Sequence, residues 1–288
     1  MPEVIVDPSR PRWDGDGARP IRVTVWEPPG DGPHPVVLLS HGTGGRVSDL
    51  AWLAEPLAAD GILVAGVDHH GNTAAEPAYL PEGFALVWER PRDLSFLLGH
   101  LLATRGDVDA GRVGVAGFSL GGYTAMALLG ARIDPYVATA VLTGEAPLPP
   151  LPEFPDLIAS LHERAPVPEL LAHARDGSVS LRDDRVRGAF AIAPSIGPLV
   201  ETASLGEITA PLMLWWGDAD DNAVPADNAR RYLDAVPTAS GRSLGPEVGH
   251  YEFLGASADP HRARDRVAAD ATAFFAGLFA AGDGRMGA

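Results

Sequence analysis

The sequence predicts an α/β fold in which a mostly parallel central sheet is flanked by helices. Short, almost continuous apolar runs alternate with longer stretches whose apolar residues recur at helical spacing. This alternation is typical of parallel sheets that helices bury on both faces. A serine between two glycines also follows one of the apolar runs directly, where a strand would pass into a helix. The 288 residues suffice for one large domain with a well-buried core, or for two small ones.

The expected strands are short and rich in valine and leucine. Residues 20–27 alternate apolar and polar side chains with period two, which predicts a half-buried antiparallel strand. Parallel strands buried on both faces are predicted, in chain order, over residues 36–40, 62–67, 113–116, 188–193 and 212–216.

The segments between these strands carry helical periodicity. Leu94, Leu97, Leu98 and Leu101 share one stripe of a helix expected over residues 92–104. Two further helices are expected over residues 48–60, where Asp60 and Gly61 provide a stop, and 263–280, before a glycine-rich tail.

One segment, residues 143–186, departs from the alternation. It begins with a proline-rich stretch over residues 146–155 and continues with two short helices expected over 157–164 and 167–175. This length exceeds an ordinary connection between a strand and a helix. We therefore interpret residues 1–288 as a single domain with residues 143–186 as a cap or lid insertion; a mobile surface loop is the alternative.

The composition excludes several classes of function. The chain has 22 Lys and Arg against 38 Asp and Glu, a formal net charge of −16, and such a surface repels nucleic-acid phosphates and anionic lipid headgroups. There is no cysteine, which rules out disulfides, thiolate zinc sites, iron–sulfur clusters and a cysteine nucleophile. Any covalent catalysis must therefore use an oxygen or nitrogen nucleophile.

The N-terminus lacks the basic start and the apolar stretch of a secretory signal, and no apolar run is long enough to span a bilayer. We therefore expect a cytoplasmic protein without a membrane span and without nucleic-acid partners. A homodimer remains open.

The strongest chemical signal is Gly117-Phe118-Ser119-Leu120-Gly121, between the apolar run at 113–116 and a helical segment. A Gly-x-Ser-x-Gly element in this setting is typical of a nucleophile elbow, a tight turn that presents the serine hydroxyl above the sheet. A side chain at either glycine would collide with the neighbouring strand or helix. Ser119 is therefore the candidate nucleophile.

A serine nucleophile needs a base, and the order serine, acid, histidine predicts both partners late in the chain. His250 follows Gly249 in a loop before the last helix and is the candidate base. Three aspartates compete for the acid after the strand at 212–216. We favour Asp221, four residues before Pro225, over Asp220, three after Gly217, and place Asp218 last.

Acyl transfer also needs donors for the developing oxyanion, which we assign to the backbone N–H groups of Thr43 and Leu120. Thr43 lies in a glycine-containing loop, and we interpret its neighbour His41 as a structural residue that orients this loop. His69 and His70 are adjacent, point in different directions and have no third ligand at diagnostic spacing, so we predict no metal there. We assign Trp215 and Trp216 to packing, and expect no cofactor.

Five motifs together resemble the α/β-hydrolase superfamily and, within it, the branch of predicted dienelactone hydrolases and platelet-activating-factor acetylhydrolase-like esterases. The resemblance extends over residues 20–279 and implies the α/β-hydrolase fold and a serine-hydrolase mechanism. Dienelactone hydrolases proper use a cysteine nucleophile, so their substrate class does not carry over to this cysteine-free chain. The motifs are Ser-His-Gly-Thr-Gly-Gly at 40–45, Val-Asp-His-His-Gly-Asn at 67–72, Arg-Pro-Arg-Asp-Leu-Ser at 90–95, Gly-Phe-Ser-Leu-Gly-Gly at 117–122, and Gly249-His250.

The function that the sequence predicts is hydrolysis of small carboxylic esters with a short-to-medium, apolar acyl group, through an acyl-serine intermediate. Acyl transfer, or the opening and closing of lactones, is an alternative that would use the same residues. A non-catalytic binding protein on a hydrolase fold is the alternative from a different class.

Overall fold

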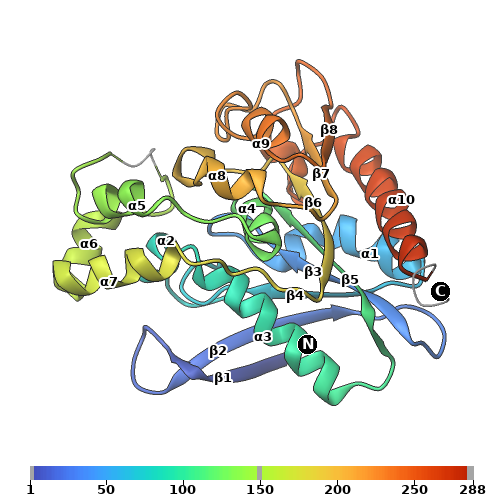
Figure 1. Cartoon of the computed structure of the whole chain (residues 1–288), viewed down its shortest axis with the longest axis horizontal. Helices are drawn as coiled ribbons and strands as arrows, with labels where there is room; N and C mark the ends of the chain where they lie inside the picture. Colours follow the sequence, from blue (N-terminus) through green and yellow to red (C-terminus); the bar gives the residue numbers. More distant parts are fainter. Residues whose placement is uncertain (1–2, 148–150, 284–288) are drawn as a thin grey trace.

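The computed structural model describes residues 3–147 and 151–283, and within them the strands form one eight-stranded sheet in the order β1-β2-β4-β3-β5-β6-β7-β8 (Figure 1). The pairs β1–β2 and β2–β4 are antiparallel and all other pairs are parallel. The predicted fold class is thereby confirmed. The strands are β1 (Glu3–Pro11), β2 (Ala18–Trp26), β3 (His34–Ser40), β4 (Leu63–Asp68), β5 (Val108–Phe118), β6 (Val186–Ile192), β7 (Leu212–Trp216) and β8 (Ala239–Ser243).

All six predicted strands are present, but the two strands at the sheet edges, β1 and β8, escaped prediction. β8 consists of Ala, Ser, Gly, Arg and Ser, so it carries no apolar periodicity, and its pairing with β7 defines it. β1 contains Asp7, Pro8 and Ser9, which locally indicate a turn. Edge strands bury less side-chain surface than central ones, and their sequence signal is correspondingly weak.

Helices cover both faces of the sheet (Figure 1). On one face lie α1 and α10, which pack against each other, and on the other lie α3, α4 and α9. The α-helices are α1 (Ala51–Ala59), α2 (Pro81–Ala85), α3 (Glu89–Thr104), α4 (Leu120–Leu129), α5 (Pro135–Leu142), α6 (Leu157–Arg164), α7 (Val167–Gly177), α8 (Thr202–Gly206), α9 (Ala229–Ala235) and α10 (Ala263–Asp283). Three 3₁₀ helices are η1 (Val47–Leu50), η2 (Gly197–Leu199) and η3 (His250–Phe253).

The strand β3 shows why its sequence is almost continuously apolar. Val36 and Leu38 face the core on the α3 and α4 side, whereas Val37 and Leu39 face the core on the α1 and α10 side. All four side chains are fully buried. A strand covered on both faces has no polar side, so the period-two alternation disappears from its sequence.

The segment 143–186 contains α6 and α7, close to where the two short helices were expected. α5 lies before this segment and packs against α7, so the departure from alternating strands and helices begins earlier than predicted. α6 packs against α2. Figure 1 shows α5, α6 and α7 grouped at one end of the molecule, away from α10. Residues 148–150 of the proline-rich stretch, the start of the chain at 1–2 and the glycine-rich tail at 284–288 lie outside the described residues. No helix in the described part of the chain is long and apolar enough to cross a membrane.

Candidate active site

The turn between β5 and α4 holds Ser119 in a strained conformation. Its φ of 55° and ψ of −119° lie in a region that side chains rarely adopt. A Cβ on Gly117 would lie 2.1 Å from the Gly121 carbonyl oxygen, and one on Gly121 would lie 2.0 Å from the Ser40 carbonyl oxygen. The two glycines therefore let α4 start directly beside β3 and β5, with the serine side chain at the turn.

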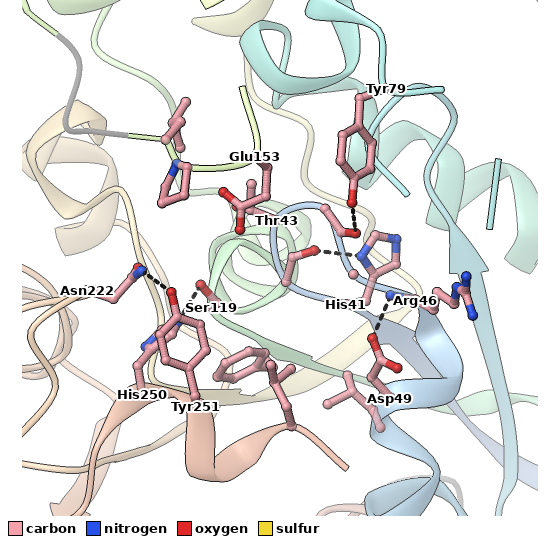
Figure 2. Close-up of a pocket in the computed structure, with 18 residues that line it drawn as sticks. His41, Thr43, Arg46, Asp49, Tyr79, Ser119, Glu153, Asn222, His250 and Tyr251 are labelled. Carbon is pink, nitrogen blue, oxygen red and sulfur yellow. Dashed lines mark hydrogen bonds between the residues drawn. The ribbon is translucent and has the colours of Figure 1, made fainter. Parts of the chain in front are cut away.

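Ser119, His250 and Asp220 form a continuous hydrogen-bonded array. His250 Nε2 lies 3.0 Å from Ser119 Oγ, and His250 Nδ1 lies 2.6 Å from Asp220 Oδ2. The imidazole packs against Phe118, with ring centroids 4.8 Å apart, and the three polar residues are only 3–5% exposed. Figure 2 shows the Ser119 and His250 side chains pointing toward each other at the pocket wall. This arrangement can pass a proton from the hydroxyl to the imidazole.

The structure reverses the predicted order of preference among the aspartates. Asp220 is buried, and its Oδ1 accepts the backbone N–H groups of Asn222 and Ala223 at 3.0 and 2.7 Å, which leaves Oδ2 for His250. Asp221 is exposed and makes no hydrogen bond to His250. Asp218 instead binds Trp216 and Arg230. The turn after β7 directs one carboxylate inward and the next outward, which the spacing to Pro225 does not reveal.

The loop after β3 carries the Thr43 amide. Asn72 Oδ1 accepts the Gly44 N–H at 2.6 Å, and the Gly42 carbonyl accepts the Gly45 N–H at 3.3 Å. Within the described residues the Thr43 N–H has no acceptor. The Leu120 N–H opens α4, where a helix supplies no acceptor of its own. Both amides predicted for the oxyanion are therefore available, and Thr43 lines the same pocket as Ser119.

The pocket above Ser119 has a volume of about 250 Å³. Sequence reasoning assigned no role to several polar residues on its wall, because they lie on segments far apart in the chain. Asn222 Nδ2 donates to Tyr251 Oη at 3.0 Å beside His250, and Tyr79 Oη donates to the Gly44 carbonyl at 2.8 Å. The remaining unassigned polar residues of the wall are Arg46, Asp49 and Glu153, the last from the predicted cap (Figure 2).

The other side chains singled out from the sequence have structural partners. Trp215 and Trp216 are buried, which confirms the packing assignment. His70 binds Glu76, whereas His69 binds Ser40 and Asp93. In residues 3–147 and 151–283 no group of three or more His, Asp or Glu side chains is arranged to hold a metal ion.

The chain is similar in sequence to two esterases of known name. The chain is 28% identical over 245 residues to a monoacylglycerol lipase of Mycolicibacterium smegmatis, covering 77% of this chain and 82% of the lipase. It is 29% identical over 116 residues to cutinase est2 of Thermobifida alba, covering 38% of this chain and 35% of the cutinase.

Two solved structures share the fold. A puromycin-hydrolyzing peptidase of Mycobacterium tuberculosis superposes with a TM-score of 0.58 at 15% identity, over 96% of this chain and 39% of the peptidase. An α/β serine hydrolase homologue from Coxiella burnetii superposes with a TM-score of 0.55 at 13% identity, over 95% of this chain and 96% of that chain.

Residues 31–250 match the family described as serine aminopeptidase S33. This match spans most of the chain, and the chain therefore belongs to the serine aminopeptidase S33 family of the α/β-hydrolase superfamily.

Proposed function

We propose that the protein hydrolyses carboxylic esters through an acyl-serine intermediate. The observation that carries this proposal is the array from Asp220 through His250 to Ser119, which opens into a pocket beside the Thr43 amide, for which the described residues provide no acceptor. The monoacylglycerol lipase and the cutinase to which the chain is similar support an ester substrate.

In the proposed mechanism, Ser119 attacks the ester carbonyl while His250 Nε2 takes the hydroxyl proton. The Thr43 and Leu120 amides bind the oxyanion, and Asp220 stabilises the imidazolium. As the tetrahedral intermediate collapses, His250 returns the proton to the leaving alcohol, and the acyl group stays on Ser119. A water molecule then enters, His250 removes its proton, and attack on the acyl-serine releases the acid and regenerates the hydroxyl.

We also propose that residues 143–186 form a cap over the pocket. Leu151, Pro152 and Glu153 line the pocket although they lie more than thirty residues after Ser119 in the chain, which supports a covering segment within a single domain. A cavity of about 250 Å³ suits a short acyl group. Within the superfamily, the quoted motifs support a place near the dienelactone hydrolase and platelet-activating-factor acetylhydrolase-like branch, with serine in place of cysteine.

The test is hydrolysis of p-nitrophenyl esters from acetate to palmitate by wild type, Ser119→Ala and His250→Ala. We expect turnover of the short esters and a loss of at least about a thousandfold in each variant. Adding an alcohol acceptor separates hydrolysis from acyl transfer, because a transferase would form a new ester in place of the free acid. A wild type that hydrolyses no ester while Ser119 still reacts with a fluorophosphonate would contradict the proposed reaction.

A further inference from the structure

A buried arginine that contacts no carboxylate of the described residues lies behind the loop that carries Thr43. Arg90, in the first turn of α3, is 1% exposed. Its Nη2 donates to the His41 carbonyl and lies 3.3 Å from His41 Nδ1, but its Nε and Nη1 have no hydrogen-bond partner among the described residues. No carboxylate oxygen of residues 3–147 and 151–283 lies within 4.0 Å of the guanidinium. A buried charge without a partner is costly, and such violations of the usual packing rules concentrate at functional sites.

The nearby carboxylate is occupied by other groups. Asp93, one turn further along α3, is fully buried. It pairs with Arg19 at 2.7 Å and with Arg10 at 2.8 Å, and accepts the Nδ1–H of His69 at 3.0 Å. Asp93 is therefore in direct contact with Arg10 and Arg19 and acts on Arg90 only at longer range, whereas Arg90 donates directly to the His41 carbonyl.

The two histidines between Asp93 and the loop have fixed protonation states. Since the carboxylate of Asp93 can only accept, His69 carries its proton on Nδ1, and its Nε2 accepts from Ser40 Oγ, 2.9 Å away. The backbone N–H of His69 points to His41 Nε2 at 3.1 Å, so that nitrogen must also accept. Burial, followed by the charge of Arg90, lowers the pKa of His69 to about 3 and that of His41 well below its usual value. Both rings are thus neutral at neutral pH.

His41 consequently donates its Nδ1–H to the Gly42 carbonyl, 2.6 Å away. That carbonyl and the Thr43 N–H belong to one peptide group, so whatever orients and polarises the carbonyl does the same to the amide. A Cβ on Gly42 would lie 3.3 Å from Ser119 Cβ, so this peptide group borders the nucleophile directly. Figure 2 shows His41 beside Thr43 at the pocket edge.

We propose that Arg90 is a positioning residue for the oxyanion. It holds the His41 carbonyl, and its unpaired positive charge lies behind the loop, so the Thr43 amide is oriented toward the reacting carbonyl and attracts the developing negative charge more strongly. This inference rests on the proposed function. It adds a residue outside the pocket wall whose contribution grows as the substrate oxygen becomes anionic.

The test compares Arg90→Met, which keeps the length but removes the charge, with Arg90→Lys, which keeps the charge. Arg19→Met is the matched control, because Arg19 is equally buried but paired with Asp93. For each variant we would measure kcat and KM for the best ester, the rate at which a fluorophosphonate labels Ser119, and the melting temperature. The labelling step also places a phosphoryl oxygen in the oxyanion site, so it reports on Arg90 even if no ester proves to be a substrate.

We expect Arg90→Met to lower kcat and the labelling rate about 10- to 100-fold, with KM changed less than about threefold. Arg90→Lys should recover most of both rates, and the melting temperature of Arg90→Met should not fall, because an unpaired buried charge is removed. Arg19→Met should show the opposite pattern, a lower melting temperature with a smaller loss of kcat.

Two results would overturn the inference while leaving the proposed function intact. One is an Arg90→Met enzyme with wild-type kcat and labelling rate. The other is a loss of rate that Arg90→Lys does not recover and that accompanies a lower melting temperature, because packing alone would then explain it. If wild-type Ser119 neither labels nor turns over any ester, the proposed function and this inference fail together.

Discussion

The molecule contains two Ser–His–Asp arrays with the same hydrogen-bond connectivity and different surroundings. In one, Ser119, His250 and Asp220 meet at the wall of a cavity of about 250 Å³. In the other, Ser40 ends β3, His69 follows β4 and Asp93 lies on α3, and all three are at most 1% exposed. Both serine oxygens lie about 3 Å from an imidazole Nε2, at 3.0 and 2.9 Å.

Hydrogen-bond connectivity to a histidine and an aspartate is therefore not enough to make a serine a nucleophile. Ser119 has a positive φ and opens to the pocket, whereas Ser40 ends a regular strand and is sealed. His69 is also held neutral by burial and by Arg90, so it cannot take a proton at neutral pH. The second array is therefore suited to holding the Thr43 loop in place and not to chemistry.

Replacing each serine with alanine should give the largest difference in activity between the two arrays. Ser119→Ala should lose at least about a thousandfold in ester hydrolysis and all fluorophosphonate labelling. Ser40→Ala should keep labelling and lose activity less than about tenfold, because Ser40 has no access to substrate. Mass spectrometry of the labelled protein locates the probe. Recovery of the probe on Ser40 would contradict the distinction between the two arrays.

The acid of the open array gives the next largest effect. Asp220→Asn should lower kcat on the order of a thousandfold, since the amide no longer fixes the imidazole tautomer or stabilises the imidazolium. Asp221→Asn, one residue away and exposed, is the matched control and should stay within about threefold of wild type. Steady-state kinetics on a short ester decides between them, and a larger loss in Asp221→Asn would restore the order expected from the proline spacing.

The acid of the sealed array should act on stability. Asp93→Asn leaves Arg19 and Arg10 without their shared buried carboxylate, and we expect the free energy of unfolding to fall by about 3–5 kcal/mol. Asp109→Asn removes a half-exposed aspartate that pairs with Arg112 and should cost less than about 1 kcal/mol. Urea denaturation of both variants measures the difference. Similar losses in the two would show that the buried network contributes no more than a surface pair.

The smallest expected effect is on the free energy of unfolding at acidic pH. The pKa of His69 is about 3 in the folded protein against 6.5 unfolded, so between these values the unfolded chain binds a proton that the folded chain does not. The contribution of His69 is complete above about pH 6.5 and is lost as the pH falls toward 3, at about 1.4 kcal/mol per pH unit. The pKa of His41 is also lowered by burial, so wild type should lose stability between pH 7 and 5 at least this steeply in urea denaturation, and His69→Asn should lose it less steeply by up to this slope. The half-exposed His173 provides the control variant His173→Asn, and equal slopes in all three proteins would refute the assignment.

The sequence alone predicted the fold class, the six inner strands, and Ser119 and His250 as members of the open array. Continuous apolar strands require burial on both faces, and a glycine-flanked serine between a strand and a helix can form only a sharp turn, so Ser119 follows from local patterns. His250 follows from its place after Gly249 and before the last helix. The edge strands β1 and β8 could not be predicted, because pairing with a neighbour, and not side-chain periodicity, defines them.

The choice of the acid and the contacts of the sealed array depend on the tertiary structure. Asp220 and Asp221 are adjacent and chemically identical, and the inward direction of one depends on the two amides that its turn presents. Ser40, His69 and Asp93 stand in three motifs visible in the sequence, but their contacts form only when β3, β4 and α3 pack together. Hydrogen bonds and charge interactions depend on distances of a few ångströms between residues far apart in the chain, and packing sets those distances.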